Sequence, residues 1–311
     1  MKFHQLRYLC EISRQGLSFS GAAAALHTSQ PGISKQIRLL EEELGVDLFI
    51  RNGNRIVEMT EPARRIVAIA SLVLRELEDI KAVAGEFREG SSGRLNVAAT
   101  FTFSRYILPE IFRRFVSRYP DVKVNLLQDS PAQVARLASS GEADIVMTTR
   151  PAEDFPDLLF IEYCRLPRVL LVPGGHPLLR EKRVTLKAIS MHPLITLDIG
   201  SHGQLQMREL FARSHLEPNI VFAGVDVDVV KAFVAAGLGI AVLPQLAFEP
   251  RRDSKLRALD VGHLFDPHVG CLAIRKNHYL RGYAFDFIEM LASNLDRRAI
   301  EKALAAARAA A

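Results

Sequence analysis

A group of polar side chains near the N-terminus recurs at the spacing of one helix face and is suited to contact with nucleic acid. These residues are Gln30, Ser34, Lys35 and Arg38. Amide and hydroxyl groups can read base edges, and the two cations can contact bases or phosphates. No acidic residue occurs between Glu11 and Glu41, as a surface that approaches phosphates requires. The pattern predicts a helix that reads DNA.

The surrounding sequence predicts the frame that holds this helix. The segment from Ser18 to Glu41 reads as two short helices separated by a turn at His27-Thr28-Ser29. Ser29 is a favourable N-cap, and Pro31 in the first turn loses no hydrogen bond. Apolar residues on the opposite side of the second helix are expected to face inward, namely Ile33, Ile37, Leu40 and Leu44. The segment is therefore expected to be a helix-turn-helix, with Gln30, Pro31 and Ser34 nearest the bases.

A hairpin is predicted directly after this motif. Two apolar runs in DLFIRNGNRIVEMT are joined by Asn52-Gly53, a strong two-residue turn signal. We interpret the hairpin as a wing that lies along the DNA backbone or enters a minor groove. The predicted DNA-binding residues are Ser29, Gln30, Pro31, Ser34, Lys35, Arg38, Arg51, Asn52 and Arg55.

A long helix is expected to follow, from Thr60 to about Phe87. Apolar residues alternate four and three positions apart along it, which is a heptad stripe. The stripe consists of Ile66, Ala70, Val73, Leu77, Ile80, Ala84 and Phe87. A rod of about 40 Å is too long to be buried against one small winged domain, so we expect it to form a homodimer.

Beyond the linker from Glu89 to Arg94, strands alternate with helices, as in a mainly parallel sheet. A helix through Phe103 to Arg118 is expected among them. The expected strands are RLNVAAT, KVNLLQDS, ADIVMTT, RVLLVPGG, HPLITL, NIVFAG, GIAVLP and CLAIRKN. We expect two α/β lobes with a cleft between them. The whole chain is then α+β in class. Its predicted parts are a winged helix-turn-helix at 1–59, a dimerisation helix at 60–88, lobe I at 93–163 and 267–300, and lobe II at 164–266.

Composition excludes several other classes. The chain has 311 residues and 49% hydrophobic residues, which suits a globular protein. Its net charge of +5 mildly favours an anionic partner. Its three cysteines, Cys10, Cys164 and Cys271, have no metal-ligand spacing. No apolar run reaches membrane length. We expect a cytoplasmic protein with no metal, no cofactor and no membrane contact.

The order of these parts resembles the LysR-type transcriptional regulators over essentially the full length. Several stretches are similar to the CysB-type branch, the sulfur-assimilation regulators: QLRYL, TSQPGISKQIR, SRY, DVDVVKAFVAAGLG and LRGYAFDFI. The resemblance implies a two-lobed, periplasmic-binding-protein-like effector domain. It also implies a regulator, commonly a homotetramer, that binds double-stranded promoter DNA and RNA polymerase. The implied effector is a small anion: sulfate, sulfite, thiosulfate, a sulfonate or acetylated serine.

The same resemblance implies an effector site. The matching positions are Thr100, Thr102 and Thr149 on one lobe and Ser201 with His202 on the other. Strand ends of an open α/β sheet adjoin the crevice where ligands bind, in agreement with this assignment. Phe103 stands where the branch usually has glutamine, and His202 where it has threonine. These departures leave open whether the anion is sulfate or one that a histidine favours, such as sulfite or a sulfonate.

Three other functions fit the sequence less well. An enzyme on the two-lobed domain has no supporting nucleophile, phosphate-loop or metal motif. A transport-type solute-binding protein would not carry the N-terminal DNA module. A thiol-based redox regulator would need Cys164 and Cys271 to come together, and both lie near the predicted crossings between lobes.

Overall fold

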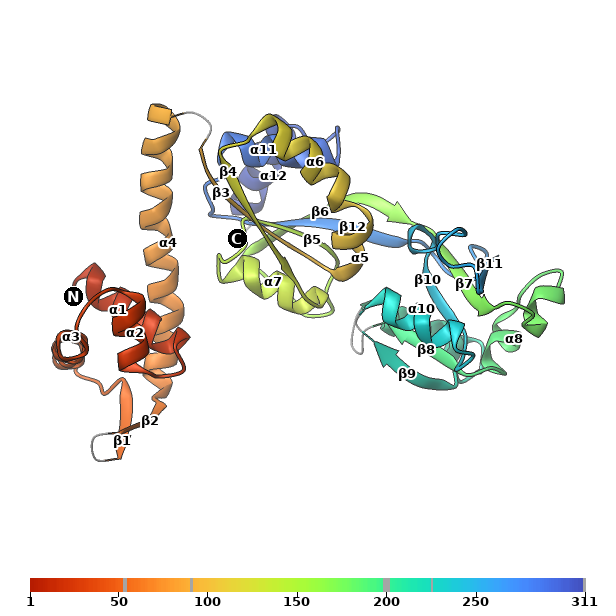
Figure 1. The fold of residues 1–311 in the computed structure, drawn as a ribbon, viewed down its shortest axis with the longest axis horizontal. Coiled ribbons are helices and arrows are strands. Elements are labelled where there is room, and N and C mark those ends of the chain that lie inside the picture. The colour runs from red at the N-terminus through yellow and green to blue at the C-terminus, as the bar shows by residue number, and fades with distance from the viewer. Residues whose placement is uncertain (53–54, 90–91, 198–201, 225, 310–311) are drawn as a thin grey trace. The chain divides into compact units, whose positions relative to one another are not determined.

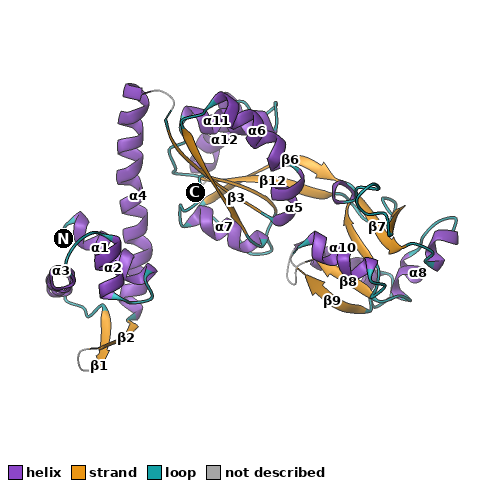
Figure 2. Cartoon of the chain, in the orientation of Figure 1, coloured by secondary structure: helices purple, strands orange, loops and turns teal. Residues whose placement is uncertain are grey.

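The computed structural model describes residues 1–52, 55–89, 92–197, 202–224 and 226–309 (Figure 1). The chain divides into two compact units, Met1–Arg88 and Glu89–Ala311. Figure 2 shows that the first unit is mostly helical and that the second mixes helices with strands. Within the described ranges, no helix has both the length and the apolar character needed to cross a membrane.

Three helices form the core of the first unit. They are α1 (Phe3–Arg14), α2 (Phe19–Ala25) and α3 (Gln30–Leu44). The Ser18 side chain accepts a hydrogen bond from the Gly21 amide, and Ser29 does the same for Gly32, so both caps hold the helix starts. Ile33, Ile37 and Leu40 are fully buried. Leu44 was expected to face inward and instead is 37% exposed, at the last residue of α3.

The predicted hairpin consists of β1 (Phe49–Asn52) and β2 (Arg55–Met59), which pair antiparallel. Helix α4 follows at Glu61–Glu89, and the Thr60 hydroxyl accepts a hydrogen bond from the Ala63 amide at its start.

One side of α4 packs against the other helices of the first unit. Ala63 is buried in the core of the three helices, and Ala70 is buried against Leu6 and Cys10. The first part of the predicted heptad stripe therefore covers the winged domain. A second set of apolar residues on α4 stays exposed: Ile69, Leu72, Val73 and Ile80.

Lobe I is built on a five-stranded sheet in the order β4-β3-β5-β12-β6. Its strands are β3 (Gly93–Ala99), β4 (Val122–Gln128), β5 (Ile145–Thr149), β6 (Leu158–Leu166) and β12 (His268–Arg275). Strand β3 is parallel to β4 and β5, whereas β12 is antiparallel to β5 and β6. A late segment of the chain therefore fills an inner position of the sheet.

Helices cover both faces of this sheet (Figure 1). They are α5 (Phe101–Tyr106), α6 (Leu108–Arg118), α7 (Pro131–Ser139), α11 (Gly282–Leu291) and α12 (Arg297–Ala309). Side chains of α6, α11 and α12 share one apolar cluster with Val97 and Leu272. Those of α7 share another with Ala98 and Ala273, so successive strand residues serve opposite faces.

Lobe II contains two small sheets. Strands β7 (Arg168–Pro173), β10 (Ala241–Pro244) and β11 (Leu256–Asp260) pair in the order β10-β7-β11, and β8 (Leu194–Leu197) pairs with β9 (Ile220–Gly224). Its helices are α8 (Leu186–Ser190), α9 (His202–Arg213) and α10 (Val227–Ala235), with short 3-10 turns η1 (Pro177–Arg180) and η2 (Gln245–Ala247). The chain crosses between the lobes at Pro167 and again between β11 and β12.

The structure differs from the sequence expectations in a few elements. The sheet expected to be mainly parallel is mixed, because β12 returns from lobe II and pairs antiparallel with β5 and β6, and the three-stranded sheet of lobe II is antiparallel throughout. The single helix expected from Phe103 to Arg118 is broken at Ile107, because Pro109 lacks an amide and its ring clashes with the preceding turn. The lobe boundary expected at 163/164 falls inside β6, which pairs with β12 as far as Leu166. Lobe I also extends beyond residue 300, since Leu304 of α12 is buried in its core.

Candidate nucleic-acid interface and ligand cleft

The exposed side of α3 carries the predicted DNA-reading residues. Gln30 is exposed and donates a hydrogen bond from Nε2 to Ser34 Oγ, at 3.2 Å. Pro31, Lys35 and Arg38 are exposed as well, and Ser29 caps the helix. The fully buried isoleucines on the opposite side fix the rotation of α3, so these polar groups face outward together. The helix therefore offers hydrogen-bonding groups at its N-terminal end and cations one and two turns further on.

The wing residues are described in their backbone alone. Arg51 and Asn52 lie in β1, and Arg55 opens β2, with Asn52 paired opposite Arg55. The backbone thus places all three at the tip of the hairpin.

A cleft of about 890 Å³, counting the space that is open to solvent, lies between lobe I and lobe II. The lobe I wall includes Thr100, Thr102, Phe103, Asp129, Ser130, Pro131 and Thr149. The lobe II wall includes Arg168, Ile195, Thr196, Leu197, Gln204, Met207, Val242 and Pro244. Leu166 and His268, near the two crossings, complete the lining.

The lobe I wall is a row of hydroxyl groups at strand ends. Thr100 directly follows β3, Thr149 ends β5, and these two strands are parallel neighbours, so their carboxyl ends meet. The Thr100 amide donates to the Met147 carbonyl, at 3.1 Å, and this bond ties the two strand ends together. Thr102 lies in the first turn of α5, while Phe103 is buried behind it in the lobe I core.

The lobe II wall supplies a buried cation and a buried hydroxyl. Arg168 is only 5% exposed, and burial lowers its pKa to about 10, with Asp266 acting in the opposite direction, so the guanidinium is charged at neutral pH. Its Nη2 donates to Gln206 Oε1 at 3.4 Å, whereas its Nε has no hydrogen-bond partner among the described residues. Thr196 is 3% exposed, and within the same described ranges its Oγ1 is also without a partner.

Unsatisfied buried donors are costly, by about 1–3 kcal/mol each, and a bound acceptor removes that cost. Arg168 and Thr196 therefore make this wall suited to an oxyanion. The carboxylate of Asp129, exposed on the opposite wall, can accept a hydrogen bond from a cationic part of the same ligand.

The structure brings Thr100, Thr102, Phe103 and Thr149 together in one wall of the cleft. Ser201 lies outside the described residues, and His202 is described only as the backbone start of α9. Sequence reasoning missed Arg168, Thr196 and Gln204. The signals were present, since Thr196 lies near the end of a short buried strand, as Thr149 does, and Arg168 opens an otherwise apolar strand.

Cys164 and Cys271 lie in surroundings that suppress thiol reactivity. Cys164 in β6 pairs with Gly270 of β12, the residue before Cys271, so the two thiols lie on neighbouring strands, and both are free. Burial, and then the nearby Glu162 carboxylate, raises the pKa of Cys271 to about 11, and burial raises the pKa of Cys164 as well. Redox-sensing thiols require a lowered pKa and access to solvent.

Comparison with known proteins identifies the class. Residues 3–64 match the family model "Bacterial regulatory helix-turn-helix protein, lysR family", and residues 88–296 match "LysR substrate binding domain". The chain belongs to the LysR family and is a LysR-type transcriptional regulator.

The similar proteins lie in one part of that family. The chain is 40% identical over 304 residues to the transcriptional regulator CysB of Burkholderia cenocepacia, covering 98% of this chain and 97% of that one. It is 38% identical to SsuR of the same organism, covering 96% of this chain and 97% of that one.

Solved structures agree with the fold. The cofactor-binding domain of the Cbl transcriptional regulator is 35% identical and matches with a TM-score of 0.65, over 68% of this chain and 93% of that one. Full-length CbnR in complex with its target DNA is 21% identical and has the same fold, with a TM-score of 0.67 over 96% of this chain and 100% of that one.

The surroundings of the thiols yield a prediction about their reactivity. The thiolate is the reactive form, so a raised pKa means less thiolate at neutral pH. We expect iodoacetamide to modify Cys271 of the native protein at least about ten-fold more slowly near pH 7 than after unfolding in urea, and the native rate to rise toward alkaline pH. Mass spectrometry of timed samples measures both rates. Rapid modification of native Cys271 at neutral pH would contradict the assignment.

Proposed function

We propose that this regulator binds promoter DNA through the exposed side of α3 and the wing, and binds a small oxyanion in the cleft between lobe I and lobe II. The observation that carries the ligand assignment is that two buried residues of the lobe II lining, Arg168 and Thr196, each have a donor atom that no described group pairs, and that the opposite wall of the cleft is rich in hydroxyl groups. A guanidinium with neighbouring hydroxyls is a favourable environment for sulfate-like and carboxylate groups.

The chemical class of the ligand follows from the relatives and from the lining. The similarity to CysB, SsuR and Cbl supports a sulfur-related anion: sulfate, sulfite, thiosulfate, a sulfonate or acetylated serine. Asp129 in the same lining favours a ligand that carries an ammonium group beside its anionic group, as O-acetylserine does. Sulfate has no group for Asp129 to bind, so Asp129 separates the two kinds of ligand.

Ligand binding is proposed to act on DNA by linkage. An anion that contacts both walls favours the lobe arrangement in which the walls are closest, and it shifts DNA affinity or bending by its differential affinity for the two states. RNA polymerase is the proposed partner at the promoter. The similarity to known regulators supports this role over catalysis, and the raised pKa values of the thiols weigh against redox sensing.

A homodimer through α4 is part of the proposal, and pairs of such dimers are proposed to form the homotetramer. Ile69, Val73 and Ile80 lie on one side of α4, four and seven residues apart, and are exposed in the single chain. A partner helix would bury them.

Substitutions on α3 test the DNA interface. Lys35→Ala should weaken operator binding and reduce the slope of log affinity against log salt by about one, because one phosphate contact is lost. Gln30→Ala should mainly reduce the preference for operator over unrelated DNA. Fluorescence anisotropy at several salt concentrations measures both quantities, and the exposed Lys187→Ala of lobe II is the control. Unchanged binding in both α3 variants would refute the interface.

A charge placed on α4 tests the dimer. Ile80 is 65% exposed, and Ile80→Asp would bury a carboxylate in the proposed helix pair without damaging the single chain. Sedimentation velocity should show a shift toward the monomer. Glu78→Ala, about 200° around the helix, should sediment like the parent. Parent-like sedimentation of Ile80→Asp would rule out this pairing surface.

Removal of hydroxyl groups tests the anion site. Thr196→Val and Thr102→Ala should each cost about 1–3 kcal/mol of anion binding, because a donor to a buried anion is lost. Calorimetry on the full chain with sulfate, sulfite, thiosulfate, a sulfonate and O-acetylserine measures this, with Ser190→Ala outside the cleft as control. Asp129→Asn should weaken the binding of O-acetylserine and leave the binding of the other anions unchanged. If an anion binds the parent and both threonine variants equally, the site lies elsewhere.

A further inference from the structure

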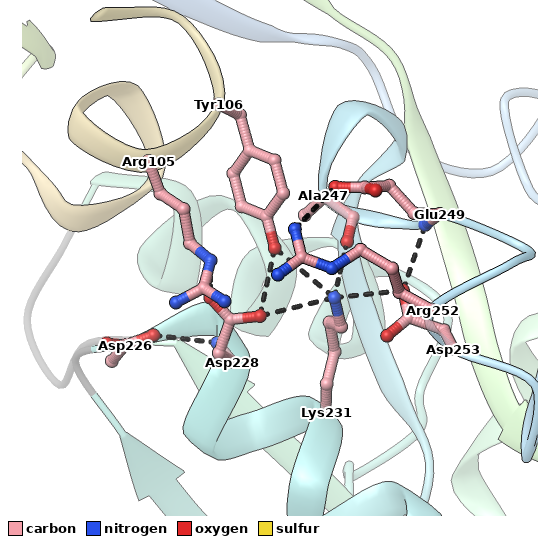
Figure 3. Close-up of polar contacts among 9 residues, drawn as sticks. All are labelled: Arg105, Tyr106, Asp226, Asp228, Lys231, Ala247, Glu249, Arg252 and Asp253. Atoms are coloured by element: carbon pink, nitrogen blue, oxygen red, sulfur yellow. Dashed lines mark hydrogen bonds and ion pairs between the residues drawn. The ribbon is translucent and has the colours of Figure 1, made fainter. Parts of the chain in front are cut away.

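Beside the cleft, side chains of both lobes meet in a polar cluster (Figure 3). Its centre is Lys231 of α10, which is 7% exposed. The ammonium contacts Ala247 O at 2.8 Å, Asp253 Oδ2 at 2.9 Å, and both Tyr106 OH and Asp228 Oδ1 at 3.2 Å. Three of these partners belong to lobe II, and Tyr106 belongs to α5 of lobe I.

Side chains of lobe I contact both carboxylate oxygens of Asp228. Tyr106 OH donates to Oδ1 at 2.9 Å, and Arg105 Nε forms an ion pair with Oδ2 at 2.7 Å. Asp228 is held in place on its own side, since its amide donates to Asp226 Oδ1 at the start of α10. Two consecutive residues of α5 thus bind one carboxylate of the other lobe.

At the same place, each lobe packs an apolar side chain against the core of the other lobe. The Tyr106 ring packs against the lobe II cluster that contains Val227 and Val230. In return, Leu246 of η2 packs against the lobe I core. The Lys231 end of the cluster is therefore shielded from water, where its interactions are stronger than on the surface, while the Arg105 side chain stays about half exposed.

Short stretches of chain join the cluster to both walls of the cleft. Helix α5 has only six residues, and Thr102 of the lobe I wall precedes Tyr106 by four positions, one helical turn. On lobe II, Pro244 of the cleft lining directly precedes η2. Movement of the cluster must therefore move both walls of the cleft.

We propose that Arg105, Tyr106 and Asp228 form a cross-lobe latch that holds the two walls of the cleft at the separation a bound anion requires. Arg105 and Tyr106 are then positioning residues for the ligand site, although neither lines it. The inference rests on the proposed anion site, since a ligand that touches both walls binds only when the walls are correctly spaced. Opening of the latch reduces the population of the binding-competent arrangement and weakens apparent affinity in proportion.

The charges of the cluster support this role. Arg105 and Lys231 balance Asp228 and Asp253, so the cluster formed by these four side chains carries no net charge. Burial raises the pKa of Tyr106, which keeps its hydroxyl protonated as the donor to Asp228. Without the lobe I groups, Lys231 still contacts Ala247, Asp253 and Asp228, so lobe II retains its own hydrogen bonds.

The test removes the cross-lobe bonds and leaves the packing in place. The double variant Arg105→Gln/Tyr106→Phe keeps the ring and the bulk of both side chains. Calorimetry on the full chain with sulfate, thiosulfate and O-acetylserine should show Kd raised about five-fold or more for each anion that the parent binds. Arg105→Lys, which keeps the ion pair, should stay within about two-fold of the parent. Arg113→Gln, which breaks an exposed pair with Glu110 within α6, is the control for the lost charge.

Amide hydrogen exchange provides a second readout that needs no ligand. In the double variant, the amides of α5 and α10 should exchange faster than in the parent, while those of α6 stay unchanged. Parent-like affinity in the double variant, for an anion that the parent binds, would overturn the latch. If the parent binds none of the anions, the proposed function fails, and exchange alone then decides: faster exchange in α5 and α10 supports the latch, and unchanged exchange refutes it.

Discussion

Two lobes with separate apolar cores share one cleft, and the width of that cleft depends on the contact beside it, where Tyr106 enters the lobe II cluster and Leu246 enters the lobe I core. The covalent links between the lobes are only the two chain crossings, at Pro167 and before β12. Short crossings restrict the lobes to hinge-like motion without fixing their spacing. The exchanged side chains and the charges around Lys231 supply the fixed spacing.

The cleft itself combines features that a stable fold would avoid. Arg168 and Thr196 are buried with donor atoms that no described group pairs, and an unpaired buried donor costs stability. Residues that violate good packing in this way are concentrated at functional sites. The side of α3 that we propose reads DNA differs, because its polar groups lie at the surface and its buried isoleucines fill the core. The proposed DNA surface therefore lies on a well-packed helix, and the unpaired donors belong to residues that line the proposed ligand cleft.

The sequence was a good guide wherever periodicity was clean. The helix-turn-helix, the hairpin, the long helix and most strands of the two lobes were predicted, since each shows its apolar repeat within a short window. Strands β6 and β11 were missed. Both are edge strands with charged residues such as Glu162 and Arg257, and these obscure the apolar pattern of a half-solvated strand.

The candidate site was predicted only by half. Thr100 and Thr149 stand at the ends of strands that were recognised, so their wall of the cleft was expected. Arg168 and Thr196 face them from a different lobe, and no local spacing in the sequence reports that meeting. The cluster around Lys231 is still further from local patterns, because its lobe I and lobe II members are more than 120 positions apart, as the separation of 125 between Lys231 and Tyr106 shows.

The inner position of β12 has a consequence for the way the chain is made. Strand β12 lies between β5 and β6, yet it begins at His268, after the whole of lobe II. On the ribosome, lobe II is complete in a single continuous stretch, whereas β5 and β6 must wait with open edges for about a hundred residues until β12 emerges. Such long-range pairing is slow, and open strand edges invite wrong partners. The nascent protein is therefore most vulnerable to aggregation during synthesis of lobe II, and a pause there would prolong the exposure of the half-built sheet.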